Sequence, residues 1–466
     1  MTVGSIFSSC TDDFEKLNTS NIQVNPADLP FAAQCTEPMT YCYPPQQNMF
    51  QFWTNLTIDL YGGYFMTPNG NFTNGDMGEN RGHSGGMYEN YYLHIFNNTR
   101  RIIAQCDASG ERGLSGVMRI VQAYGTLMTT DAYGPIPYSS ILSGENEVYF
   151  EFDSQKDLYK AMLEDLSTAI TDISAMRADE IAKLKSFDCW CNGDKDLWVK
   201  IANTMKLRMA LRLSKRETEA SNAGMNLKAI ATEAAQNTLA TVNKDILIDK
   251  SLENEMWLMF NWGDCGFNAN LVTIMSGTKD PRQPLYMTLN TGDIKNEAGT
   301  TTVAANSQYL GIRFASGLPA KPNSWGSFSG WIQGNNGSSY SMPLPIMKAA
   351  EAYFLLAEAK LRWDIGSESV KNLYENGIRV SMTNELAYRG AYAGIKEYPE
   401  GAVDAYINGT STQIDYTDPI KAELSTPAVN KLSVKWDESA SNEEKLERII
   451  TQKWLALFLS LIHISE

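Results

Sequence analysis

The sequence predicts a mainly α-helical protein, in which tetratricopeptide-like helical hairpins form a scaffold beside an irregular, loop-rich lobe with few short strands. Two observations predict this fold class. Apolar residues recur at spacings of three and four through most of the chain, which is typical of amphipathic helices. Between residues 251 and 340 that periodicity is lost, and Trp, Gly, Asn and Ser become frequent. A single hairpin cannot bury its apolar face alone, so neighbouring hairpins are expected to stack.

Composition excludes several classes of function. The 466 residues are enough for a large core, in one lobe or two domains, and the 20% charged and 43% hydrophobic content is that of a folded protein. A net charge of −15 argues against binding to nucleic acids and to anionic lipid head groups. The seven cysteines form no CxxC pair, and only three histidines occur, so we expect no metal site and no cofactor. The sequence leaves open whether any cysteines pair, and whether calcium is bound.

The N-terminus carries the remnant of a targeting signal. Residues 1–10 are too short for a complete signal peptide, but Phe7-Ser8-Ser9-Cys10 resembles the end of a lipoprotein signal. The acidic cluster at 11–15 that follows resembles a surface-export signal. We therefore expect Cys10 to be the lipidated anchor, against the alternative of a chance cysteine. Residues 18–46 predict an extended arm, and 48–60 a first helix.

Residues 61–86 predict a long loop rich in glycine and asparagine, and such loops are usually functional or mobile. Aromatic rings can stack on the C–H face of a sugar, while amides and guanidinium groups bind its hydroxyls. We therefore predict a glycan site that includes Tyr64, Phe72, Asn69 and Arg81. The alternative, that the aromatic side chains pack into the core, is equally open. The G-x-S-x-G match at 82–86 has no strand before it, so we interpret it as chance.

Amphipathic helices are predicted at intervals after this loop. Their apolar faces run through 88–106, 114–128, 155–176, 196–214 and 222–238. The second of these helices ends at Asp131-Ala-Tyr-Gly-Pro-Ile-Pro-Tyr138, where Gly134 and two prolines stop it. We interpret that loop as a structural hinge-point of the fold.

The lobe at 251–340 contains a second candidate site. Trp325, Phe328 and Trp331 lie in a glycine- and serine-rich stretch, where exposed rings are costly unless they pack or bind. We predict that they bind glycan, with the alternative that they cap the helical core. Helices are then predicted at 343–363, with outward pairs Lys348–Glu351 and Glu358–Arg362, and at 442–459.

Four segments together resemble the SusD/RagB-like outer-membrane nutrient-binding lipoproteins of the Bacteroidetes. They are the loop at 131–138, the Asp-Leu-Trp helix beginning at Asp196, the stretch AEAYFLLAEA at 350–359 and Gln452-Lys-Trp454, and they occur in the order typical of the family. The resemblance spans nearly the whole chain. It implies one SusD-like domain at 11–466, with the helical scaffold at about 48–240 and 343–459 and a ligand-binding lobe at about 251–340. The ending SLIHISE differs from the usual aromatic tail, so we expect a truncated C-terminus.

The resemblance also implies a function. It implies a non-catalytic, lipid-anchored protein on the cell surface at the outer membrane, which captures an oligosaccharide and delivers it to a SusC-like TonB-dependent transporter. Peptide capture, as in RagB-like relatives, is the alternative. No carboxylate pair stands in a recognisable glycosidase context, so we expect no enzymatic activity. The sequence does not identify the glycan.

Overall fold

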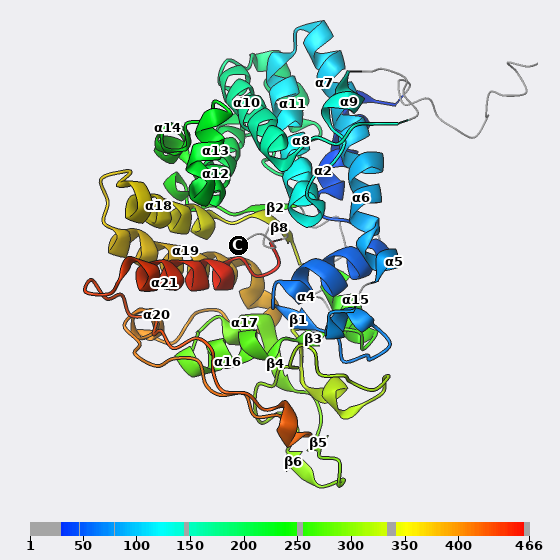
Figure 1. Ribbon diagram of the computed structural model, residues 1–466, viewed down its shortest axis with the longest axis vertical. Coiled ribbons are helices and arrows are strands. Elements are labelled where there is room, and N and C mark those ends of the chain that lie inside the picture. Colours follow the sequence, from blue (N-terminus) through cyan, green and yellow to red (C-terminus); the bar gives the residue numbers. More distant parts are fainter. Residues whose placement is uncertain are drawn as a thin grey trace, which may run out of the picture.

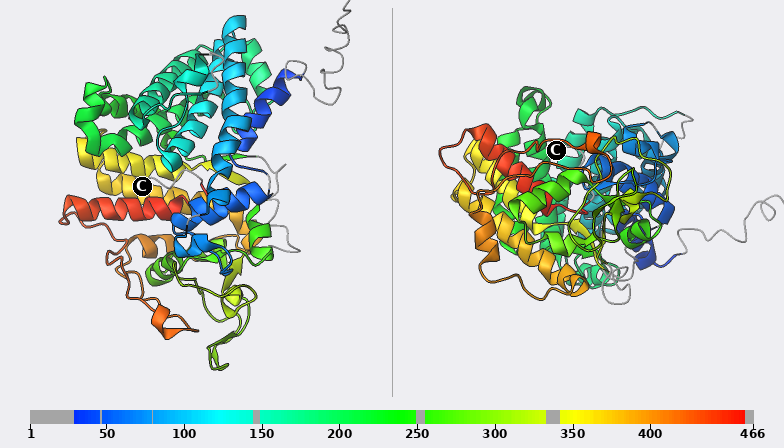
Figure 2. Two further views of the ribbon diagram at one scale, coloured as in Figure 1. Left: turned by 45° about the vertical axis from the view of Figure 1, so that its right-hand side comes forward. Right: turned by 90° about the horizontal axis from the view of Figure 1, so that it is seen from below.

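The computed structural model describes residues 29–45, 47–78, 80–143, 149–248, 255–332 and 342–460. Stacked helices form the upper part of the molecule, and an irregular lobe with short strands forms the lower part (Figure 1). A second helical group, which includes α18, α19 and α21, lies between them in Figure 1 and in the left-hand view of Figure 2. This arrangement confirms the predicted fold class. Cys10, the segment at 333–341 and the ending after 460 lie outside the described residues.

The upper hairpins pack on one another in chain order. Their helices are α7 (Asn97–Ser109), α8 (Arg112–Tyr133), α10 (Gln155–Ser174), α11 (Ala178–Lys185), α12 (Lys195–Arg212), α13 (Glu217–Asn222) and α14 (Leu227–Ala234), with the 3₁₀ turn η5 (Leu213–Arg216) after α12. Gly116 permits the close contact between α8 and α10, since a Cβ there would lie 3.1 Å from the Ala169 carbonyl oxygen. The helix predicted at 222–238 is present as α14 and the following 3₁₀ turn η6 (Ala235–Asn237).

The loop at 131–138 fixes the end of α8. Gly134 has a φ of 76°, which favours glycine, and it ends the helix. The Tyr92 hydroxyl donates to the Pro137 carbonyl at 2.6 Å, and the Asp153 carboxylate accepts from the Tyr138 amide at 2.9 Å. Since contacts from two other elements hold the loop, it serves the fold, as the sequence predicts.

The second helical group consists of α18 (Ala349–Trp363), α19 (Val370–Ala393), α20 (Ala402–Ile407) and α21 (Asn442–Ala456). Arg208 on α12 donates two hydrogen bonds of 2.5 Å to Glu351, and both side chains are buried. This pair joins the two helical groups. The predicted outward pair Lys348–Glu351 is therefore wrong, and the buried Lys348 instead pairs with Glu385. The predicted pair Arg362–Glu358 is confirmed at 2.6 Å.

The start of the helix predicted at 343–363 is also wrong. Residues Leu344–Met347 form β8, which pairs antiparallel with β2 (Ile246–Ile248). Pro345 is thus a strand residue, and α18 begins only at Ala349. In the chain order, β8 follows the elements of the lower lobe and directly precedes α18.

The lower lobe holds three further two-stranded pairs within the described residues. They join β1 (Phe65–Met66) to β3 (Gly266–Phe267), β4 (Met287–Asn290) to β7 (Ser329–Trp331) and β5 (Ile294–Lys295) to β6 (Thr301–Val303). The lobe is less irregular than predicted, because it also contains α15 (Glu255–Asn261), α16 (Ala269–Thr278), α17 (Gln283–Tyr286) and the 3₁₀ turn η8 (Ser324–Ser327).

The N-terminal region differs most from expectation. Residues predicted as an extended arm form α2 (Phe31–Tyr41), which contains Pro38 and lacks a side-chain N-cap. The helix predicted at 48–60 is present as α3 (Gln47–Met49), the π-helix η2 (Phe50–Ile58) and α4 (Asp59–Tyr61). The loop at 61–86 contains η3 (Thr73–Asp76) and α5 (Arg81–Ser84). After it, α6 (Gly86–Asn90) and the π-helix η4 (Tyr91–Phe96) lead into α7.

Among the described residues, no helix has the length and apolar character needed to cross a membrane.

Candidate functional site

The three aromatic side chains predicted to bind glycan in the lower lobe lie inside the protein. Trp325 is 4% exposed, Phe328 2% and Trp331 1%. The Trp325 indole N–H donates to Asp418 at 3.2 Å, and the Trp331 ring lies beneath the Arg389 guanidinium. None of these rings presents a face to solvent. Their positions fit the alternative interpretation, in which they cap the core.

Tyr64 and Asn69, from the first predicted site, are also buried. The Tyr64 ring stacks on Trp454 with centroids 5.2 Å apart, and its hydroxyl donates to the Trp454 carbonyl oxygen at 2.7 Å. The Asn69 amide donates to Asp264 at 3.0 Å. Both side chains therefore hold the loop in place beneath the surface.

Phe72 and Arg81 are the two predicted residues that reach the surface. Phe72 is half-buried and Arg81 is exposed. Phe72 lies beside His83, with ring centroids 5.7 Å apart, and the other neighbour of His83 is Phe52 on η2. The Phe52 and His83 rings are parallel within 7° and 4.3 Å apart. The structure thus brings three rings from η2, the loop and α5 together.

His83 is held in one orientation. The Asn80 side chain caps α5 by accepting from the His83 amide at 3.2 Å. His83 Nδ1 lies 3.0 Å from Asn74 Oδ1, so the ring donates a proton from Nδ1 to that oxygen. Burial lowers the pKa of His83 from its ordinary value, which keeps the imidazole neutral. The buried, neutral His83 ring therefore supports both phenylalanine rings without adding a charge.

Two loops far apart in the sequence are joined at this surface. The Gly70 amide donates to the Pro319 carbonyl at 3.0 Å, and the Ala315 amide donates to the Gly75 carbonyl at 2.8 Å. The Asn323 side chain donates to the Pro68 carbonyl at 2.6 Å. Gly70 permits this approach, because a Cβ there would lie 1.8 Å from the Leu318 carbonyl oxygen. The loop that carries Phe72 is therefore fixed by the loop at 315–323.

Asp264 lies at the centre of a polar cluster beside the rings. Its carboxylate accepts from Gln51 at 3.1 Å, from Asn69 at 3.0 Å and from Lys321 at 2.6 Å. Lys321 also donates to the Trp262 carbonyl at 2.8 Å. Gln51 precedes Phe52 on η2, and Asn69 lies three residues before Phe72, so the cluster adjoins the three rings.

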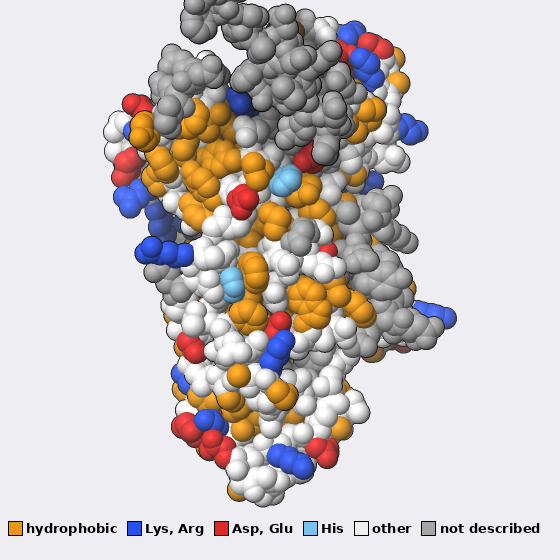
Figure 3. Space-filling model, turned by 90° about the vertical axis from the view of Figure 1, so that its right-hand side faces the viewer, with side chains coloured by type: hydrophobic (Ala, Val, Ile, Leu, Met, Phe, Trp, Pro, Cys, Tyr) orange, Lys and Arg blue, Asp and Glu red, His pale blue; other side chains and the backbone are white. Residues whose placement is uncertain are grey.

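The resulting face, here called the aromatic face, consists of Phe52, Phe72, Arg81, His83, Trp262 and Lys321. It is on the side of the molecule that carries α5 and α15, where hydrophobic side chains gather at the surface among polar ones (Figure 3). Sequence reasoning missed Phe52, His83 and Trp262. The apolar spacing that marks Phe52 is that of a buried helix face, and only its neighbours show that it stays half-exposed.

The family described as "SusD-like: Susd and RagB outer membrane lipoprotein" matches residues 15–460. The chain belongs to this family. No curated protein matches it.

Solved SusD homologues share the fold over almost the whole chain. A chitin-binding SusD homologue from Flavobacterium johnsoniae is 26% identical, with a TM-score of 0.79, and the match covers 93% of this chain and 85% of that one. A SusD homologue from Bacteroides thetaiotaomicron is 26% identical, with a TM-score of 0.77 and coverage of 94% and 84%. One from Bacteroides ovatus is 26% identical, with a TM-score of 0.74 and coverage of 93% and 84%.

Proposed function

We propose that this SusD-like protein captures oligosaccharides on its aromatic face. The observation that carries the proposal is the group of rings in which the partly exposed Phe52 and Phe72 both contact the buried His83, near Arg81 and the Asp264 cluster. The partly exposed rings of Phe52 and Phe72 offer stacking surfaces for sugar C–H groups, and the exposed Arg81 and Lys321 offer donors for hydroxyls. The chitin-binding homologue from Flavobacterium johnsoniae supports a glycan as the ligand.

The proposal also covers the role of the protein in the uptake of oligosaccharides. Lipidated at Cys10, it would stay at the cell surface on the outer membrane and pass its ligand to a SusC-like TonB-dependent transporter. Membership of a family of outer-membrane lipoproteins supports this. The binding step would be non-catalytic, because three donors already hold Asp264, the carboxylate beside the rings.

Calorimetry with a panel of oligosaccharides that includes chitin fragments tests the proposal. Phe72→Ala and Arg81→Ala should each weaken binding about fivefold to tenfold, since an aromatic contact contributes about 0.5–1.5 kcal/mol beyond its buried area. Phe152→Ala is the matched control, because Phe152 is an exposed ring outside the aromatic face. Equal affinity in all three variants would disprove the assignment of the site.

Two outcomes would change the proposed function. Binding of short peptides but of no glycan would favour the RagB-like alternative of peptide capture. Shortened oligosaccharides after incubation with the protein would show turnover and contradict a binding-only role.

A further inference from the structure

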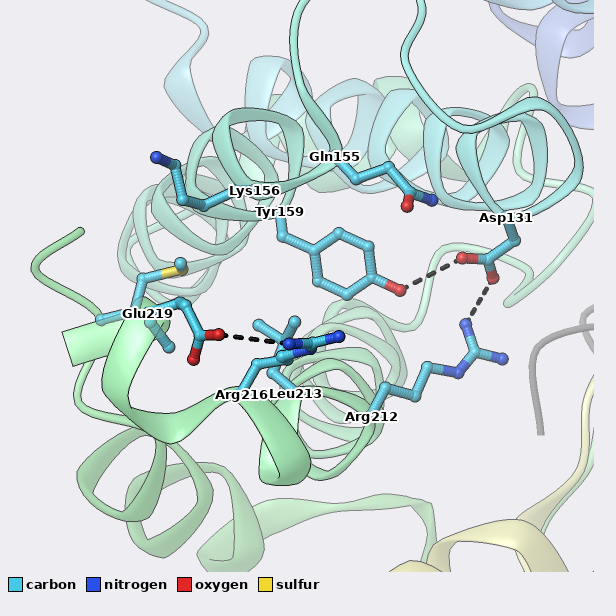
Figure 4. Close-up of a pocket in the computed structure, with 10 residues that line it drawn as sticks. Asp131, Gln155, Lys156, Tyr159, Arg212, Leu213, Arg216 and Glu219 are labelled. Carbon is cyan, nitrogen blue, oxygen red and sulfur yellow. Dashed lines mark hydrogen bonds and ion pairs between the residues drawn. The ribbon is translucent and has the colours of Figure 1, made fainter. Parts of the chain in front are cut away.

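A cavity of about 470 Å³ opens in the upper helices, away from the residues that form the aromatic face. It lies where α8 ends, α10 begins and η5 leads into α13, and its walls include Asp131, Tyr159 and Arg216 (Figure 4). Its volume is in the range of sites that enclose small organic ligands. The loop that begins at Asp131 therefore borders a cavity that the proposed function does not use.

Most polar groups on one side of the cavity are engaged within the protein. Asp131 accepts from Arg212 at 2.5 Å and from the Tyr159 hydroxyl at 3.1 Å, and the Gln155 amide donates to the Thr130 carbonyl at 2.8 Å. Figure 4 shows Asp131 and Arg212 together at one end of the Tyr159 ring. A ligand with many hydroxyl groups would find few partners there. This argues against a sugar.

The remaining lining is apolar, with charges at the rim. Leu213, Ala220 and Met225 provide the apolar surface. Arg216 and Lys156 are exposed cations, and Lys156 forms no hydrogen bond or ion pair with another described residue. Arg216 pairs with Glu219 at 3.2 Å, but these side chains are 72% and 56% exposed, so water screens the pair. The rim thus carries two cations and one anion on a protein whose net charge is −15.

We propose that this cavity binds a small apolar acid, meaning an aliphatic or aromatic group that bears one carboxylate. The apolar group packs against Leu213 and Met225, and the carboxylate lies between Lys156 and Arg216. Two sources fit this chemistry, namely a free carboxylic acid and the C-terminal residue of a peptide. Glu219 competes with the ligand for Arg216 and therefore limits affinity.

Calorimetry and saturation-transfer NMR test the proposal with two pairs of probes. One pair is 4-methylvaleric acid and its amide, and the other is the tripeptide Gly-Gly-Leu and its C-terminal amide. The acids should bind up to about fivefold more tightly than the amides for each exposed ion pair that the carboxylate forms. If only one of the two acids binds, the result shows whether the ligand is a free carboxylic acid or the C-terminal residue of a peptide. Absence of binding by both, or equal binding of acids and amides, would overturn the proposal.

Rim variants make the test specific. Lys156→Gln and Arg216→Gln should each weaken binding of the acid about fivefold, whereas Glu219→Gln should strengthen it. Lys160→Gln is the matched control, because Lys160 is exposed on α10 but does not line the cavity. An unchanged affinity in both Lys156→Gln and Arg216→Gln would contradict the site. Oligosaccharide affinity should be unaffected by all four variants, so the outcome is independent of the proposed function.

Discussion

The guanidinium carbon of Arg389 lies 5.6 Å from the centroid of the Trp331 ring, deep in the protein. The rings of Tyr286 and Phe458 lie at 5.4 and 5.3 Å from the same carbon, and Glu385 accepts from Arg389 Nε at 2.7 Å. A buried guanidinium needs both a counter-charge and aromatic faces to offset its lost hydration. Trp331 therefore completes the surroundings of a buried cation.

Replacement of Trp331 should lower the stability of the fold and leave the binding surface intact. Trp331→Ala should lower the free energy of unfolding by about 3–5 kcal/mol, because it leaves a cavity and removes a ring from Arg389. Urea unfolding followed by circular dichroism measures this loss. Phe72→Ala, on the surface, should stay within about 1 kcal/mol of the wild type. A stable Trp331→Ala protein with weakened oligosaccharide binding would instead support the site predicted from the sequence at Trp325, Phe328 and Trp331.

A second prediction about stability follows from the buried pair Arg208–Glu351. Glu351→Gln should cost about 3–5 kcal/mol, because it leaves the Arg208 charge uncompensated between α12 and α18. The double variant Arg208→Met with Glu351→Leu should recover much of that loss, since no charge remains buried. Thermal unfolding of the set gives the comparison. A double variant as unstable as Glu351→Gln would contradict this interpretation.

Asp264 should affect binding through the position of its neighbours. Asp264→Leu leaves the donors of Gln51, Asn69 and Lys321 without their acceptor, which costs about 1–3 kcal/mol for each buried donor left unpaired. We expect weaker oligosaccharide binding and faster amide exchange in residues 67–72. Hydrogen exchange followed by mass spectrometry measures the second effect. Asp264→Asn retains one acceptor oxygen and should be milder.

His83 should make stability depend on pH. Burial lowers its pKa in the folded protein, so as the pH falls the unfolded chain binds a proton first, near its ordinary pKa of about 6.5. The free energy of unfolding should therefore decrease as the pH drops below about 6.5, and this decrease should stop once folded His83 is protonated. NMR titration should place the folded midpoint below that of a model peptide. His83→Gln should remove this part of the pH dependence.

Much of the helical scaffold could be predicted from the sequence, because its signal is local. The helix α10 carries apolar residues at helical spacing, so the chain itself indicates which face is buried. The same spacing predicts α8 and α12, although almost all of their residues are buried. Helix α2 was missed because Pro38 and its polar residues give no such pattern. Strand β8 was missed because its partner, β2, is about a hundred residues earlier in the chain.

The candidate site was harder to predict for a related reason. Whether an aromatic ring is exposed depends on segments that pack against it from elsewhere in the sequence. Trp331 looks like a surface ring among glycines and serines, yet Arg389 and Phe458 enclose it. Phe52 looks like a core residue, yet it stays half-exposed beside His83. Composition alone therefore pointed to the loop at 61–86, but only to Phe72 and Arg81 among the residues of the aromatic face.

The contact between Tyr64 and Trp454 has a consequence for how the protein is produced. Each residue hydrogen-bonds to the backbone of the other segment, since the Trp454 indole N–H donates to the Gly62 carbonyl at 2.8 Å. About 390 residues separate the two partners. The loop that carries Phe72 thus lacks this part of its support until almost the entire chain has been synthesised. A nascent chain that stops before α21 would contain every residue of the aromatic face. The loop that carries Phe72 would still lack its contacts with Trp454.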